Sequence, residues 1–201
     1  MSENVKLIGI TGGIGSGKSV VGNYLREKGY TLVDADEVSR EITAKGEPVL
    51  DRVREIFGDV VFMPDGSLDR GALGAIIFSD KEARDVVEKI FHEEIGNRIK
   101  VLCDEAIERG AMKVFLSIPL LYETGNDKRM DEIWVVTAKE EIRIKRVKKR
   151  DGLSEYEIRL RMQAQMPEEE RLNKGAVIIE NNGTQKELKG KIDNLLKYDL
   201  W

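Results

Sequence analysis

Cysteine and histidine are almost absent from this chain, whose 201 residues include one of each. The single cysteine, Cys103, excludes an internal disulfide and any zinc site built from several cysteines. The single histidine, His92, excludes a metal site built from a histidine cluster. Cys103 lies in an apolar pattern of helical period, so we expect it in a helix core; a reactive thiol is the alternative.

Long apolar runs and an excess of basic residues are also lacking. No stretch approaches the length of a membrane span, and the N-terminus lacks the basic start and apolar run of a signal sequence. The net charge is -4 although 35% of the residues are charged, so the chain has no basic field of the kind that marks nucleic-acid binders. We expect a cytoplasmic, monomeric protein that binds neither membranes nor nucleic acid.

Five short apolar runs, separated by stretches of helical period, predict an α/β fold. The runs cover residues 6–10, 31–33, 114–118, 133–137 and 176–179. Such alternation favours a parallel sheet with helices on both faces, and the ligands of such sheets bind beyond the carboxyl ends of the strands. About eighty residues separate the second run from the third, more than one crossover helix needs, so we expect an inserted lobe there. Its sequence predicts a turn at 63–67 and helices at 69–78 and 81–109.

The most specific feature is a glycine-rich loop that reads Gly12-Gly13-Ile14-Gly15-Ser16-Gly17-Lys18-Ser19. It matches the phosphate-binding pattern Gly-x4-Gly-Lys-Ser/Thr and lies between a predicted strand and a helix that Gly29 stops. Glycines let backbone N–H groups surround a polyphosphate, while Lys18 reaches the β- and γ-phosphates and the Ser19 hydroxyl ligates Mg²⁺. We therefore predict a three-layer P-loop NTPase fold with a five-stranded parallel sheet. A glycine-rich turn with an exposed lysine is the alternative.

Two carboxylates follow the second predicted strand, in Val33-Asp34-Ala35-Asp36. They are one strand period apart, so their side chains should share one direction at the sheet edge that carries the loop. Phosphoryl transfer needs one acid near Mg²⁺ and one that accepts the proton of the attacking hydroxyl. We assign Asp34 to the magnesium shell and Asp36 as the base. The alternative is that Asp36 caps a helix beginning at Glu37.

The third predicted strand, 114–118, supplies no acid of its own. It runs directly into Pro119, where P-loop enzymes usually carry the carboxylate that supports the metal. Acidity on the metal side must then come from Asp34 or from Glu123, which strengthens the assignment of the earlier pair.

Arginines gather on one face of a predicted helix, at positions 143, 146 and 150, and two more follow the break at Gly152. Guanidinium groups on one face repel each other unless solvent or acids screen them, but they also clamp phosphoryl oxygens. A solvated charge run and a phosphate-facing lid both fit this pattern, and beside a P-loop we favour the lid.

Three further polar positions each leave two interpretations open. Arg70 is either a surface charge or an anchor for an anionic acceptor. His92 is either a packing residue or a substrate contact. The segment Asn181-Asn182-Gly183 is either a plain turn or part of the pocket for a nucleotide base.

Taken in their joint order, these features resemble the dephospho-CoA kinases, almost from end to end. The resemblance rests on residues 10–19, 33–36, 65–70, 119–123, 161–165 and 181–183. It implies transfer of the ATP γ-phosphoryl group to the ribose 3′-hydroxyl of dephospho-CoA with Mg²⁺, the last step of coenzyme A biosynthesis. It also implies one P-loop kinase domain over 1–201, with an acceptor-binding helical lobe near 60–112 and an arginine-bearing lid near 139–168.

The residues and the resemblance together give a candidate site. The expected catalytic residues are Asp36, Asp34, Lys18 and Arg146. The expected ATP contacts are Gly12, Gly13, Ile14, Gly15, Ser16, Gly17, Lys18, Ser19, Val20, Arg146, Arg150, Asn181 and Gly183. The expected acceptor contacts are Asp36, Arg70, His92, Leu120, Glu123 and Arg161, and the expected metal ligands are Ser19 and Asp34.

The chain departs from the family pattern at three places. Val20 stands where the family usually has threonine, Glu93 follows His92 in place of proline, and Gly175-Ala176 replaces an Ala-Asp pair. None of these positions carries the proposed chemistry.

Two other functions compete with this interpretation. A regulatory GTPase should carry an Asn-Lys-x-Asp guanine reader, but the nearest string, at 173–176, lacks the aspartate. A nucleoside or nucleotide kinase would share the paired acids and the arginine lid, so only the acceptor distinguishes it from the leading hypothesis.

Overall fold

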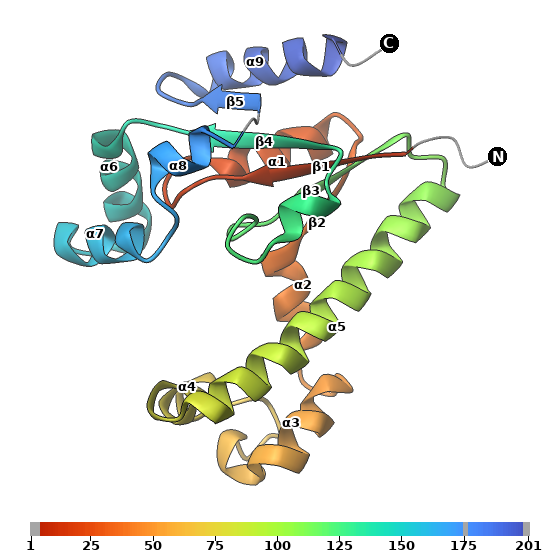
Figure 1. The fold of residues 1–201 in the computed structure, drawn as a ribbon, viewed down its shortest axis with the longest axis vertical. Helices are drawn as coiled ribbons and strands as arrows, with labels where there is room; N and C mark the ends of the chain where they lie inside the picture. Colours follow the sequence, from red (N-terminus) through yellow and green to blue (C-terminus); the bar gives the residue numbers. More distant parts are fainter. Residues whose placement is uncertain (1–4, 175–176, 199–201) are drawn as a thin grey trace. The chain divides into compact units, whose positions relative to one another are not determined.

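The computed structural model describes residues 5–174 and 177–198. Within these ranges the chain divides into two compact units, one formed by residues up to 32 together with those from 106 onward, the other by residues 33–105 (Figure 1). The inserted segment expected between the second and third strands corresponds to this second unit. None of the described helices is long and apolar enough to cross a membrane.

The sheet has five strands in the order β2-β3-β1-β4-β5, and all of them lie in the first unit except β2, which crosses the boundary between residues 32 and 33. Its strands are β1 (Lys6–Thr11), β2 (Thr31–Asp34), β3 (Lys113–Ser117), β4 (Glu132–Thr137) and β5 (Val177–Glu180). The pairs β1·β3, β1·β4 and β4·β5 are parallel, so the carboxyl ends of these strands meet at one edge. All five predicted strands are confirmed within about one residue, and Ala176, the predicted start of the fifth, lies outside the described residues.

Helices α1 (Lys18–Glu27) and α9 (Gln185–Tyr198) share a core with the sheet. The apolar side chains of these two helices pack against strand residues such as Ile8, Phe115 and Trp134, each fully buried. Phe115 packs edge-on against Tyr30 and tilted against Trp134, with ring centroids 5.4 and 5.2 Å apart. This core fixes where β1 ends and α1 begins, and therefore where the glycine-rich loop lies.

Helices α6 (Glu140–Asp151) and α7 (Glu155–Gln163) form a helical hairpin beside the loop, followed by the short helix α8 (Glu168–Leu172). The hairpin turns at Gly152, whose φ of 70° suits glycine, and Ser154 begins α7 with a capping box. Its apolar interior contains Ile144, Val147 and Ile158, and Ile14 from the loop packs against them. The glycine-rich loop and the expected lid therefore share one small hydrophobic cluster.

The second unit is helical. It contains α2 (Ala35–Ile42), α3 (Val49–Phe57), α4 (Arg70–Ser79) and the long α5 (Lys81–Glu108), with a short 3₁₀ turn, η1 (Asp59–Val61). The Asp69 carboxylate caps α4 by accepting from the N–H groups of Gly71 and Ala72. The predicted helices at 69–78 and 81–109 and the turn at 63–67 are confirmed.

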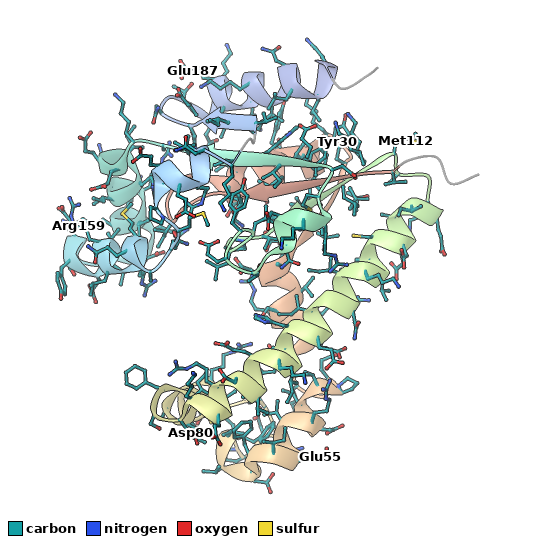
Figure 2. The ribbon with its side chains drawn as sticks, in the orientation of Figure 1. Tyr30, Glu55, Asp80, Met112, Arg159 and Glu187 are labelled. Atoms are coloured by element: carbon teal, nitrogen blue, oxygen red, sulfur yellow. The ribbon has the colours of Figure 1, made fainter. Side chains whose placement is uncertain are left out.

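In the second unit, apolar side chains are buried in a core and charged side chains lie on the surface. Its core joins Val53, Val61, Leu73 and Val87, while charged side chains cover the outer surfaces of both units, as Glu55 on α3 and Arg159 on α7 illustrate (Figure 2). Cys103 on α5 is buried, as expected for a core position.

Candidate active site

The glycine-rich loop joins the carboxyl end of β1 to α1. Gly17 precedes the helix with a φ of 99°, a conformation that glycine adopts readily, and the Val20 N–H closes the first turn onto its carbonyl. The N–H groups at the start of a helix lack partners within the helix and carry partial positive charge. The loop and the first turn of α1 thus have the donor-rich geometry that a polyphosphate needs.

Asn181 and Arg146 hold the backbone of this loop from outside. The Asn181 side-chain N–H donates to the Ser16 carbonyl at 2.8 Å, and Asn181 is only 5% exposed. Arg146 on α6 donates to the Ser16 carbonyl at 3.3 Å and to the Asn181 carbonyl at 3.0 Å. Both expected ATP contacts therefore engage a carbonyl of the loop backbone.

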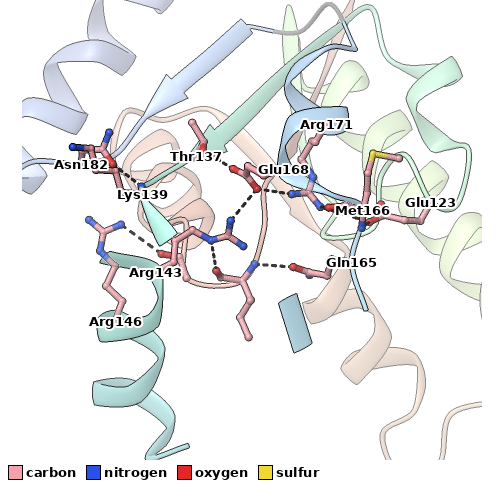
Figure 3. Close-up of polar contacts among 12 residues, drawn as sticks. Glu123, Thr137, Lys139, Arg143, Arg146, Gln165, Met166, Glu168, Arg171 and Asn182 are labelled. Atoms are coloured by element: carbon pink, nitrogen blue, oxygen red, sulfur yellow. Dashed lines mark hydrogen bonds and ion pairs between the residues drawn. The ribbon is translucent and has the colours of Figure 1, made fainter. Parts of the chain in front are cut away.

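Arg143, which lies on α6 as Arg146 does, also supports the loop. The sequence pattern does not distinguish Arg143 from Arg146 and Arg150. The Arg143 Nε donates to the Ile14 carbonyl at 2.9 Å, and its guanidinium forms an ion pair with Glu168 at 3.0 Å (Figure 3). The side chain is 8% exposed, and this burial lowers the pKa of Arg143, which Glu168 opposes. Arg143 is therefore a structural support of the loop, so the three arginines of α6 are not one exposed cationic face.

Gly13 is required by this close approach of Arg143. A Cβ at position 13 would overlap the guanidinium, and the nearest Arg171 nitrogen would lie 3.2 Å away. We predict that Gly13→Ala destabilises the protein by about 1–3 kcal/mol, because Arg143 must shift inside a packed site. The measurement is thermal or urea unfolding. Gly190→Ala is the matched control, since this exposed α9 glycine has open space around it and alanine favours a helix. Equal stability of Gly13→Ala and wild type would contradict the close-packing argument.

Lys18 has a defined position at the end of β3. Its ammonium donates to the Ser117 hydroxyl at 2.7 Å, and Ser117 is 1% exposed. Ser117 is the last residue of β3, so this strand does supply a polar group to the site, a hydroxyl and not a carboxylate. A pattern that expects a carboxylate at this strand end does not identify the serine.

The paired carboxylates lie in the second unit, and their local geometry differs from the expectation. Asp34 ends β2 and caps α2 by accepting from the N–H groups of Asp36 and Glu37 at 2.9 and 3.3 Å. The proposal that Asp36 caps a helix beginning at Glu37 is wrong, because the helix begins at Ala35 and Asp34 is the cap. The two side chains also do not share one direction by strand period, since Asp36 already belongs to the first helical turn.

Four of the expected contacts have the following surroundings within their own units. Arg70, at the start of α4, donates to the Thr43 hydroxyl at 2.5 Å. His92 is exposed on α5. Arg150, at the end of α6, forms an ion pair with Asp151 at 2.6 Å that lowers the pKa of Asp151, and the exposed Arg161 on α7 adds a smaller effect in the same direction.

The remaining expected contacts belong to the first unit. Leu120 is 42% exposed after β3, and the Glu123 carboxylate accepts from the Met166 N–H at 2.9 Å. Ser19 is exposed in the first turn of α1, next to the half-buried Val20. At Gly183 a Cβ would meet the Glu187 carboxylate, which already accepts from the Thr184 N–H in the turn before α9. These positions are compatible with the expected roles and do not test them.

The parallel sheet, the glycine-rich loop at the end of its central strand and the fixed lysine define the class as a P-loop kinase fold. A family model described as dephospho-CoA kinase matches residues 6–187, and the chain belongs to this family. The dephospho-CoA kinase of Shouchella clausii is 42% identical over 89% of this chain and 90% of its own.

Two solved structures agree with this assignment. The crystal structure of TT1252 from Thermus thermophilus is similar with a TM-score of 0.80 and 36% identity, covering 98% of both chains. The dephospho-CoA kinase from Campylobacter jejuni has a TM-score of 0.68 and 26% identity, covering 95% of both chains. The fold, the family and the activity expected from the resemblance, ATP-dependent phosphorylation of dephospho-CoA, are confirmed.

Proposed function

We propose that this chain transfers the γ-phosphoryl group of ATP to the ribose 3′-hydroxyl of dephospho-CoA, with Asp36 as the proton acceptor and Lys18 on the phosphates. The single observation that carries the phosphate half of this proposal is the loop geometry. Its Ile14 and Ser16 carbonyls accept from Arg143, Arg146 and Asn181, so protein donors engage these oxygens in a loop that leads into the positive N-terminal end of α1. Family membership supports the acceptor.

Lys18 and Arg146 supply positive charge on the side of ATP. The position of Lys18 beside Ser117 suits contact with the β- and γ-phosphates, where a point charge stabilises the charge that develops during transfer. The remaining ATP contacts are assigned to Gly12–Val20, Arg150, Asn181 and Gly183. Arg146 would have to exchange part of its contact with loop carbonyls for a phosphoryl oxygen.

Asp36 is assigned to the proton of the acceptor hydroxyl. Its backbone N–H is held by the Asp34 carboxylate, which fixes the first turn of α2 and hence the base of the Asp36 side chain. A carboxylate on a fixed turn can accept the proton as the hydroxyl attacks phosphorus. Arg70, His92, Leu120, Glu123 and Arg161 are assigned to the acceptor, with 60–112 as its lobe and 139–168 as the lid.

A magnesium ion fits the donor chemistry of the assigned ligands. Ser19 provides an exposed hydroxyl in the first turn of α1 and Asp34 a carboxylate at the end of β2, and both are the oxygen donors that Mg²⁺ prefers. The described residues contain no group of three or more histidine, cysteine or acidic side chains that could hold a metal. An ion held by few side chains is expected to take its other ligands from phosphate and water. When bound, Mg²⁺ neutralises charge on the β- and γ-oxygens.

A parallel assay of acceptors tests the proposed activity. We expect ADP formation from ATP with dephospho-CoA, and at least about a hundredfold lower kcat/KM with adenosine or AMP, because these acceptors lack the remote groups that position the hydroxyl. The product should carry a new phosphate on the ribose 3′-oxygen, observable by ³¹P NMR. Turnover with a nucleoside monophosphate and none with dephospho-CoA would reject the proposal in favour of a nucleotide kinase.

The setting proposed for this activity is a cytoplasmic monomer that acts on small molecules. The acidic balance, with a net charge of -4, supports an enzyme without nucleic-acid or membrane partners. Size-exclusion chromatography with light scattering measures the mass of the particle directly.

A further inference from the structure

A buried ion cluster lies against the glycine-rich loop in the first unit, and none of the assigned catalytic roles uses it. It joins Arg143, Glu168 and Arg171, which come from α6 and α8 (Figure 3). Arg171 is 1% exposed and Arg143 8% by side chain, so two guanidinium groups are removed from solvent within one small region. Buried cations are costly unless acids pair with them closely.

Glu168 is the acid that both guanidiniums share. One of its carboxylate oxygens accepts from Arg143 at 3.0 Å and from Arg171 at 2.9 Å, and the other accepts from the Thr137 hydroxyl. The other acid near Arg171, Glu123, is 3.7 Å away and is itself held by the Met166 N–H. Glu168 therefore carries most of the compensation for both cations.

The cluster touches the loop at two successive residues. Arg143 binds the Ile14 carbonyl and fills the space beside Gly13, and Arg171 lies next to that same glycine. From the segment just before α8, the Gln165 side-chain carbonyl accepts from the Ile14 N–H at 2.9 Å. Both backbone groups of Ile14 are thus held by side chains, one from α6 and one from the segment between α7 and α8.

We propose that Glu168 is a positioning residue for ATP binding: through Arg143 and Arg171, and together with Gln165, it fixes Gly13–Ile14 and so the shape of the phosphate loop. Without its charge, the two guanidiniums would repel each other next to Gly13, and the remaining compensation would come from Glu123, 3.7 Å from Arg171, and from the electrostatic effect of Glu140 on Arg143. Arg143 would then leave the Ile14 carbonyl. This inference rests on the proposed function of Gly12–Ser19 as the ATP site.

Other roles for the cluster predict a different effect of removing the Glu168 charge on nucleotide binding. If it acted only as a source of positive charge for the triphosphate, removing the Glu168 carboxylate would raise the local positive potential and tighten nucleotide binding. If it acted only on stability, loss of Glu168 would lower the folded fraction and hence the apparent kcat, with both KM values unchanged. Positioning instead predicts weaker nucleotide binding by enzyme that is folded.

The test compares Glu168→Gln and Gln165→Leu with wild type. We expect Glu168→Gln to raise both KM for ATP and the calorimetric Kd for ADP by about tenfold or more, and Gln165→Leu to raise both by about threefold. KM for dephospho-CoA should stay within about twofold of wild type. Glu170→Gln is the matched control, because Glu170 lies exposed on the same helix and pairs only loosely with Lys174 at 3.9 Å.

Circular dichroism melts establish that each variant is folded at the assay temperature. Unchanged or tighter ADP binding by folded Glu168→Gln would overturn the proposal. If Glu168→Gln does not fold, the test rests on the variant of the half-buried Gln165. An unchanged Kd for ADP in Gln165→Leu then overturns the proposal, and a raised Kd for ADP supports it. Failure of the wild type to phosphorylate dephospho-CoA would instead reject the proposed function, so the two failures are distinguishable.

Discussion

Replacing Asp36 with asparagine is expected to lower kcat by at least about a hundredfold, because asparagine keeps the size of the side chain but cannot accept the proton of the attacking hydroxyl. Binding of ATP should change by less than about threefold, since Asp36 is assigned to the acceptor and not to the phosphates. The helix should survive, because the cap of α2 is Asp34 and the contribution of Asp36 to that cap is its backbone N–H.

Steady-state kinetics with dephospho-CoA as the varied substrate measures this effect, and ADP calorimetry measures nucleotide binding separately. Asp51→Asn is the matched control, since Asp51 is an exposed aspartate in the first turn of α3 within the same unit. A folded Asp36→Asn enzyme that keeps more than about a tenth of the wild-type kcat would remove Asp36 as the base.

The sheet and the loop could be predicted from local patterns alone. Short apolar runs of three to five residues, such as residues 6–10, indicate buried parallel strands because both faces of such a strand are covered. The loop could be identified because its function constrains consecutive residues, each with a recognisable chemical purpose. Local patterns also placed α4 and α5 to within one residue.

The supports of the loop could not be predicted, because they come from distant parts of the chain. Arg143, Gln165 and Asn181 are separated from the loop by more than 120 residues, and helical spacing makes Arg143 look equivalent to Arg146 and Arg150. Only the packing shows that one of these arginines is buried against Gly13 while another pairs with Asp151. The sequence does contain one local indication of the site, the polar Ser117 at the end of an otherwise apolar strand.

The side-chain direction predicted for the acid pair is wrong because of where the strand ends. Strand spacing predicts one direction for the side chains of Asp34 and Asp36, but the strand ends at Asp34 and the helix begins between the two residues. The capping rule then applies to Asp34, whose carboxylate serves two backbone N–H groups. The assigned roles in the reaction do not depend on a shared side-chain direction, and the Asp36 variant tests one of them directly.

Lys18→Ala is the variant for which we expect losses in both binding and turnover. KM for ATP should rise at least about tenfold and kcat should fall about a hundredfold or more, because the ammonium contacts phosphate oxygens in the ground state and more strongly as charge develops. The Ser117 hydroxyl, which now accepts from Lys18 at 2.7 Å, would remain in place without its cation.

Kinetics with ATP varied, together with ADP calorimetry, separates the two losses. Lys145→Ala removes an exposed lysine from α6 and should leave both quantities unchanged, which controls for the loss of one positive charge. Lys18 is anchored at the end of β3, while the loop shape depends on Arg143 and Gln165. Gln165→Leu alters the loop shape but keeps the Lys18 ammonium. Lys18→Ala should therefore lose far more kcat than Gln165→Leu. Wild-type kinetics from folded Lys18→Ala would contradict the phosphate-binding role of the loop itself.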